Sequence, residues 1–208
     1  MRTNGNEKNN TLLLIFCVAV SFIMIFVSDG FTAAATVREE CLRLHVLADT
    51  DSEADQQVKL MVRDAVLEET KELFTSCLSA SEAAVRAAEN AEEIKAIAEG
   101  VLRENGFSYG AEVFVEKEYF GTRQYDDVAL PAGNYTALKV VLGDGQGHNW
   151  WCVMFPPLCL PAVTERNEDS VYGVFGESGG DLVTGKSGYK VKFRIVEIVE
   201  GIIESLKS

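Results

Sequence analysis

A cysteine paired with one of the two histidines, His45 and His148, could support nucleophilic catalysis in this 208-residue chain. A histidine can convert a nearby thiol into a thiolate, and His148 precedes Cys152 by four residues. Four residues of a strand span about 13 Å, so His148 is too distant to act as the base. His45 would have to reach the thiol from a neighbouring strand, with Asp49 or Asp51 orienting its ring. The alternative is that His45 is a hydrogen-bonded structural residue.

Metal-ligand spacing is absent from the chain. It contains no C-x-x-C pair, and its two histidines are far apart in the sequence, which argues against zinc. Asp49, Asp51 and Asp55 could bind calcium, but the glycine and the bidentate glutamate of an EF-hand loop are missing. Helix capping explains the first two aspartates, and we expect no metal and no cofactor.

Residues 180–187, GDLVTGKS, match the phosphate-binding P-loop pattern. A working P-loop needs a buried strand before the first glycine and a helix that begins at the lysine. Here a further glycine-rich stretch precedes Gly180, and Gly188 follows the pattern. Asp181 and Glu177 would also repel phosphate. We therefore expect no nucleotide binding, and we interpret Gly143, Gly145 and Gly147 as a hairpin turn.

Two adjacent tryptophans, Trp150 and Trp151, favour a binding surface. Side chains of consecutive strand residues point to opposite faces, so one indole can enter the core while the other stays outside. Exposed tryptophans are common anchors at protein interfaces. The predicted partner-binding set adds Asn149 before them and Pro156 and Pro157 after them. The alternative is that the second indole is covered by another segment of the chain.

Polar residues around the first predicted helix suggest two interpretations. One is a solvated helix surface, since several of them recur at i, i+4. The other is a polar lock in which Arg63 and Asp64 pair across to the tryptophan-bearing strand, because the planar guanidinium suits bidentate contacts. The predicted lock contains His45, Asp51, Asp55, Lys59, Arg63 and Asp64.

Four cysteines follow the N-terminal segment: Cys41, Cys77, Cys152 and Cys159. An even number in an exported chain permits disulfides, and Cys152 and Cys159 flank a proline corner where a short bridge can form. Buried reduced thiols are the alternative, since cysteine is among the most buried residue types.

Hydrophobic periodicity predicts an α+β domain with the element order βααβββα, in which a small, mainly antiparallel sheet has helices against one face. Capping signals at Ser52 and Ser79 begin the first two helices. Residues 164–188 hold six glycines and five acidic residues, and we expect a loop there. The expected strands are 40–48, 107–120, 135–142 and 149–155, the last two as a hairpin after a connection over 121–133. The expected helices are 52–73, 79–104 and 189–206.

Residues 11–27 form an uninterrupted apolar block that follows Arg2 and Lys8. Residues 33–35, three alanines, offer a small-residue cleavage site, so residues 1–35 have the layout of a secretory signal peptide. A retained membrane anchor is the alternative, and cleavage is favoured. Residues 36–208 are then one exported domain. The chain carries a net charge of −13, which disfavours nucleic acid and anionic membrane surfaces as partners.

Three motifs resemble the stage II sporulation protein R family. They are LPAGNYTALKVVLGDGQGHNWWCVMFPPLC (130–159), LRLHVLADTDSEADQQVKLMVRDAVL (42–67) and, more weakly, VKFRIVEIVE (191–200). Asp49-Thr50 departs from the Asn-Ser that the family more often shows, but either pair can form a turn and cap a helix. The resemblance covers roughly the whole chain after the apolar segment.

This resemblance implies a secreted, non-enzymatic signal of spore formation. Such a protein is made in the forespore and exported into the space between forespore and mother cell. Its implied partner is a membrane-embedded aspartic protease, which it activates to process the mother-cell sigma-E precursor. The sequence leaves two alternatives, a small exported thiol-dependent hydrolase and a membrane-tethered structural component.

Overall fold

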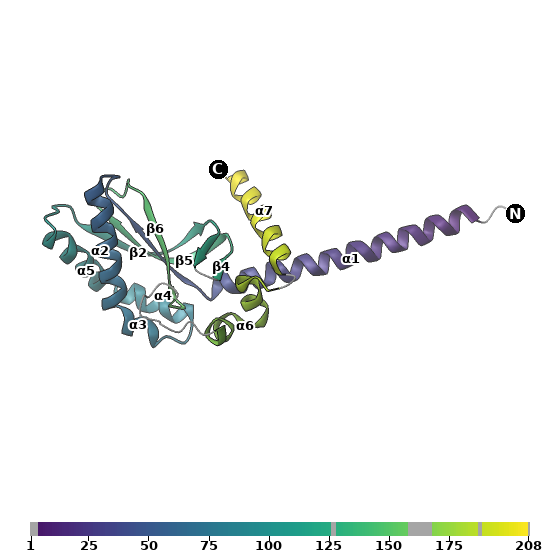
Figure 1. The fold of residues 1–208 in the computed structure, drawn as a ribbon, viewed down its shortest axis with the longest axis horizontal. Coiled ribbons are helices and arrows are strands. Elements are labelled where there is room, and N and C mark those ends of the chain that lie inside the picture. The colour runs from purple at the N-terminus through teal and green to yellow at the C-terminus, as the bar shows by residue number, and fades with distance from the viewer. Residues whose placement is uncertain (1–3, 126–127, 158–167, 187–188, 208) are drawn as a thin grey trace.

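The computed structural model describes residues 4–125, 128–157, 168–186 and 189–207 of the chain. Figure 1 shows a body of helices and strands from which one long N-terminal helix extends. The body has the α+β class that the sequence predicts. The helices are α1 (Asn4–Glu39), α2 (Glu53–Glu69), α3 (Lys71–Thr75), α4 (Ala80–Glu89), α5 (Ala91–Glu104), α6 (Glu168–Thr184) and α7 (Tyr189–Lys207). The strands are β1 (Leu42–Leu47), β2 (Ala111–Phe120), β3 (Arg123–Tyr125), β4 (Val128–Leu130), β5 (Gly133–Leu142) and β6 (Asn149–Phe155).

The main sheet is mixed and has the strand order β2-β5-β1-β6. Strand β1 is parallel to β5 and antiparallel to β6, while β2 and β5 are antiparallel. The predicted hairpin of β5 and β6 is therefore wrong, because β1 lies between the two strands. The six residues that join β5 to β6 are enough to cross one strand, since neighbouring strands lie about 4.8 Å apart. Strand β1 is one of the two inner strands, and it is buried along almost its whole length.

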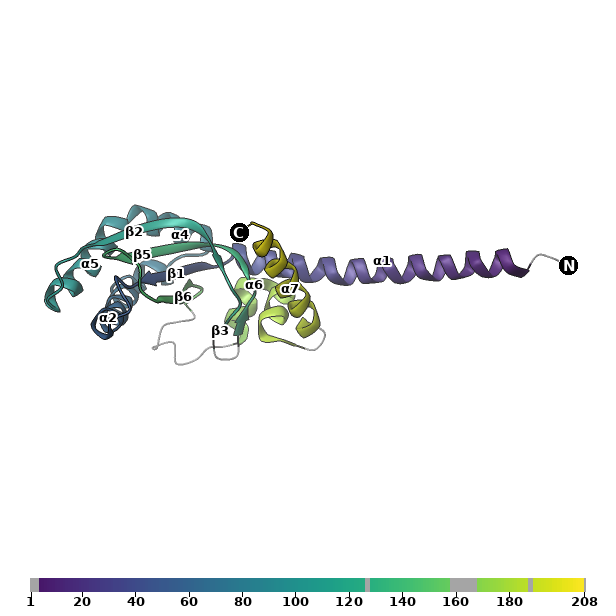
Figure 2. The same ribbon diagram turned by 90° about the horizontal axis from the view of Figure 1, so that it is seen from above.

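Helices pack on both faces of the sheet, whereas the sequence predicted helices on one face. Residues of α2, α4 and α5 form a first core with Leu44, Val46 and Leu138 of the sheet. The opposite face carries a second core, in which Tyr135 and Ala137 meet residues of α1 and α6. Figure 2 shows α6 and α7 beside the part of α1 that is nearest the sheet.

Two predicted helices are interrupted. The expected helix over 79–104 is divided into α4 and α5 at Asn90, whose side-chain amide donates to the Arg86 carbonyl at 2.7 Å. The helix that follows Ser52 is likewise divided at Thr70, whose hydroxyl donates to the Val66 carbonyl at 2.5 Å. Such side-chain bonds to the preceding turn compete with the helical pattern. The predicted caps are confirmed, because Ser52 and Ser79 each accept a backbone N–H three residues later.

The glycine-rich segment over 164–188 is not a loop where the structure describes it. Residues 168–184 form helix α6, which is kinked at Gly176, where φ is +66°. Val171, Phe175 and Leu182 are buried in the second core, and their burial explains why the segment orders despite its glycines. Residues 164–167 and 187–188 lie outside the described residues. The expected connection over 121–133 contains the small β3–β4 hairpin, and the predicted last helix is confirmed as α7.

Helix α1 joins the apolar N-terminal segment to the body without a break. Ala33, Ala34 and Val37 near its end are buried in the second core. Over the described residues, no helix combines the length and apolar character that a membrane span requires. The predicted cleavage region therefore lies inside a packed part of the fold, and cleavage itself stays a prediction.

Candidate functional site

The two tryptophans of β6 lie on opposite faces of the sheet, as the alternation predicts. Trp150 is opposite Val46 and Trp151 is opposite His45 on β1. Trp150 is 36% exposed and Trp151 is half-buried. The first indole is therefore at the surface on the α2 side, and the second lies against the other face of the sheet.

Helix α2 extends the surface around Trp150. The guanidinium carbon of Arg63 lies 4.3 Å from the centre of the Trp150 ring, within the range of a cation–π contact. The same guanidinium pairs with Asp64 at 2.6 Å. We call Arg63, Asp64 and Trp150 the Trp150 surface. It joins the predicted tryptophan site to part of the predicted polar lock. Asn149, which the sequence grouped with the tryptophans, points to the opposite face of the sheet, where its side chain contacts His45.

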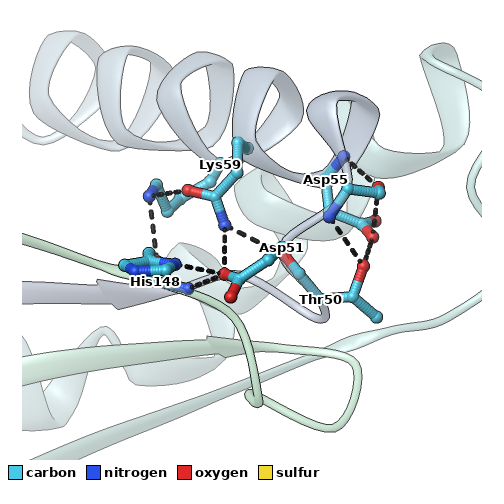
Figure 3. Close-up of polar contacts among 7 residues, drawn as sticks. Thr50, Asp51, Asp55, Lys59 and His148 are labelled. Atoms are coloured by element: carbon cyan, nitrogen blue, oxygen red, sulfur yellow. Dashed lines mark hydrogen bonds and ion pairs between the residues drawn. The ribbon is translucent and has the colours of Figure 1, made fainter.

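A polar latch below this surface ties α2 to the loop between β5 and β6. Figure 3 shows Asp51 and Lys59 converging on His148. The Asp51 carboxylate accepts the His148 backbone N–H at 2.6 Å and lies 2.5 Å from Nδ1 of its ring. The buried Lys59 ammonium donates to the His148 carbonyl at 2.9 Å and to Gln56 Oε1 at 2.5 Å. The latch fixes the strand start that carries Asn149 and Trp150.

Charge in the latch follows from these contacts. The side-chain hydrogen bond with His148 lowers the pKa of Asp51, and the backbone bond adds to the effect. Burial lowers the pKa of Lys59, and the nearby Asp51 carboxylate partly opposes that shift.

Asp55 fixes the turn that precedes α2. Its carboxylate accepts hydrogen bonds from the hydroxyls of Thr50, of Ser52 at 2.7 Å and of Tyr109 at 2.6 Å. The Thr50 bond is the largest cause of a lowered Asp55 pKa. Burial, reinforced by the bond to Asp55, raises the pKa of Tyr109. Asp55 thus holds the β1–α2 turn on which Asp51 sits.

His45 belongs to a different constellation from the rest of the predicted lock. Its Nδ1 lies 2.7 Å from Glu118 Oε2, and its Nε2 lies 2.9 Å from Asn149 Oδ1. Its ring stacks on Trp151 with 3.7 Å between centroids. Lys139 also pairs with Glu118, at 3.2 Å. His45 therefore links the central strand to both edge strands on the face opposite the latch.

The sequence did not reveal the partners of these residues. Gln56, Tyr109, Glu118 and Lys139 were all missed as members of the two constellations. Cross-strand neighbours depend on register, and no short-range pattern places β1 between β5 and β6. Gln56 had a signal, because it lies three residues before Lys59 on the same helix.

A thiol–imidazole pair is not assembled at Cys152. Its side chain shares a face with Leu44, whereas His45 points to the other face of the sheet. Cys152 is buried and disulfide-bonded. Cys159 lies outside the described residues, so its pairing with Cys152 stays a prediction. Burial raises the pKa of the Cys41 thiol to about 12, which keeps that thiol protonated and unreactive.

The remaining predicted positions can also be located. Pro156 is buried and Pro157 is half-buried, so Pro156 cannot contact a partner directly. Gly180 and the residues up to Thr184 belong to α6, and Gly185 follows its end with φ at +65°. The P-loop match therefore sits at a helix C-terminus, the wrong end for binding phosphate. In the described parts of the chain, no group of three histidine, cysteine or acidic side chains could hold a metal ion.

Comparison with known proteins gives two matches. The family model described as stage II sporulation protein R matches residues 38–165. A Bacillus subtilis (strain 168) protein with the same description is 34% identical over 185 residues, covering 80% of this chain and 83% of the relative. No solved structure matches the chain significantly. The matched range contains both the latch and the Trp150 surface.

Proposed function

The chain belongs to the stage II sporulation protein R family, and from this membership we propose that it is an exported signalling protein of sporulation. In this proposal the forespore makes the protein and exports it into the space that faces the mother cell. Its partner there is a membrane-embedded aspartic protease, and the result is processing of the mother-cell sigma-E precursor. The protein acts by binding and carries out no bond-breaking step itself.

Activation by binding has a thermodynamic requirement. The protein must bind the active, dimerised state of the protease more tightly than the inactive state. Equal affinity for the two states would leave their populations unchanged. A rigid contact surface serves this purpose, since little conformational entropy is then lost on association. The latch among Asp51, Lys59 and His148 supplies such rigidity next to Trp150.

The observation that carries the proposal is the contact of Arg63 with the partly exposed Trp150 ring. Tryptophan and arginine are among the side chains that are enriched at the positions that dominate binding energies at interfaces. Here the two are pre-stacked at 4.3 Å on neighbouring elements. A partner group that covers the indole would bury apolar area and meet the guanidinium at the same time.

The test is reconstituted signalling with the protease and a sigma-E precursor. Trp150→Ala and Arg63→Ala proteins should fold and be exported but should process much less precursor than the unaltered protein. Phe114→Ala is the matched control, because this aromatic side chain is 44% exposed on the opposite face of the sheet. Full processing with a folded Trp150→Ala protein would remove the Trp150 surface from the proposal.

A further inference from the structure

A cavity of about 340 Å³ lies where the interruption at Thr70 meets the interruption at Asn90. Its lining comes from the end of α2, from α3 and from α4 and α5. Thr70 and Asn90, the two positions of interruption, both belong to its lining. It is separate from the latch and from the Trp150 surface.

The floor of the cavity is apolar. Ile94 is fully buried, and Leu73 and Ile97 are half-buried. Side chains of this kind accept the methylene stem of a long charged residue, which keeps its polar head at the rim.

The rim of the cavity is negative. It carries three exposed carboxylates: Glu69, Glu72 and Glu93. Arg86, the basic residue of the lining, is already engaged, because its Nη2 pairs with Glu82 at 2.7 Å and its Nη1 donates to Ser76 at 2.7 Å. The cavity thus combines an apolar floor with three exposed acidic groups at its mouth.

We propose that this cavity receives an arginine or lysine side chain of a protein partner. The methylene stem would lie on Leu73, Ile94 and Ile97, and the cationic head would meet the carboxylates at the rim. Two exposed apolar side chains beside the lining segments favour a macromolecular partner, since Leu78 is 93% exposed and Val85 is 54% exposed. The net charge of −13 also favours a basic partner.

The inference does not depend on the proposed sporulation signalling. Arg63 and Glu69 both belong to α2, about 9 Å apart along its axis. One partner could therefore reach both the Trp150 surface and the cavity. Loss of the cavity contact would still leave the Trp150 surface intact, so the two proposals can fail separately.

The experiment measures binding of a short peptide, acetyl-Gly-Leu-Arg-Leu-Gly-amide, to the full-length protein by NMR. Its comparison peptide has citrulline in place of arginine, which keeps the shape and removes the charge. We expect the arginine peptide to shift resonances of Leu73, Ile94 and Ile97, with a Kd on the order of 1 mM. The citrulline peptide should bind several-fold more weakly, and added salt should weaken the binding of the arginine peptide.

A Glu72→Gln/Glu93→Gln protein should bind the arginine peptide at least about threefold more weakly than the unaltered protein does. Both side chains are exposed, so the fold should be unaffected. Glu104→Gln/Glu112→Gln is the matched control, because it removes the same charge at two other exposed positions. Equal binding of both peptides, equal binding by both double variants, or shifts confined to other surfaces would each overturn the proposal.

Discussion

Lys59 donates a hydrogen bond from its buried ammonium to the backbone carbonyl of His148, 89 positions later in the chain. This contact fixes α2 against the loop that leads into β6. The cation has neutral direct partners, Gln56 and His148, and the Asp51 carboxylate acts on it through space. The position of Trp150 thus depends on a polar contact formed away from the first core.

Replacement of Lys59 by methionine tests this dependence. Methionine keeps much of the length but leaves the His148 carbonyl and Gln56 without their donor, which should cost about 1–3 kcal/mol of unfolding free energy. Urea unfolding measures the loss. Lys117→Met is the control, because Lys117 is an exposed residue of β2 and its replacement should have little effect. Equal urea midpoints of unfolding for the two variants would show that the Lys59 contact contributes nothing to the stability of the fold.

Acid should weaken the turn before α2. The pKa of Asp55 is lowered in the folded protein, chiefly by the Thr50 hydroxyl, so folding favours the ionised carboxylate. Its stabilising effect is complete above the ordinary value of 3.8 and is lost as the pH falls through the lower, folded value. The difference in unfolding free energy between the unaltered protein and Asp55→Asn should be constant from about pH 7 to pH 5 and shrink below about pH 4.

The measurement is urea unfolding across that pH range, with Glu53→Gln as the control at an exposed residue of the same helix. A difference that stays constant down to about pH 2 would contradict the assigned role of Asp55.

Local chemistry accounts for the parts of the fold that the sequence predicted. Ser52 and Ser79 cap helices because their hydroxyls reach backbone donors three residues ahead, a contact that depends on neighbouring residues alone. The opposite orientation of Trp150 and Trp151 likewise follows from strand alternation.

Long-range pairing accounts for what the sequence did not predict. The placement of β1 between β5 and β6 decides that His45 meets Glu118 and that Cys152 faces away from it. The alternation within β1 is compatible with either neighbour. In α6, contacts of Phe175 and Leu182 with the second core outweigh the low helix propensity of glycine.

Gly147 should be intolerant of a side chain. A Cβ at this position would overlap the Thr50 backbone carbonyl, which cannot move without disturbing the turn before α2. We expect Gly147→Ala to destabilise the protein by about 2 kcal/mol or more, since overpacking against backbone typically costs 1–3 kcal/mol. Thermal unfolding measures this. Gly100→Ala is the control in helix α5, where the site is open and alanine should stabilise by about 0.5–1 kcal/mol.

Truncation of α1 should show where the folded body begins. Ala33 and Ala34 are buried in the second core, whereas the large apolar residues Leu12 and Ile25 are exposed. A protein that lacks residues 1–28 should keep the stability of the body. Removal of residues 1–35, the predicted leader, should cost at least about 2 kcal/mol, because each buried methyl group contributes roughly 0.8 kcal/mol and the half-buried Phe31 is lost as well.

Urea unfolding of both truncated proteins, followed through the tryptophans of β6, gives the comparison. N-terminal sequencing of protein recovered outside the producing cell then links stability to processing. If the body requires Ala33 and Ala34, a mature N-terminus should lie before Gly30, which is itself buried. A mature chain that begins at Thr36 and unfolds at the same urea concentration as the longer one would show that the end of α1 packs on the body without stabilising it.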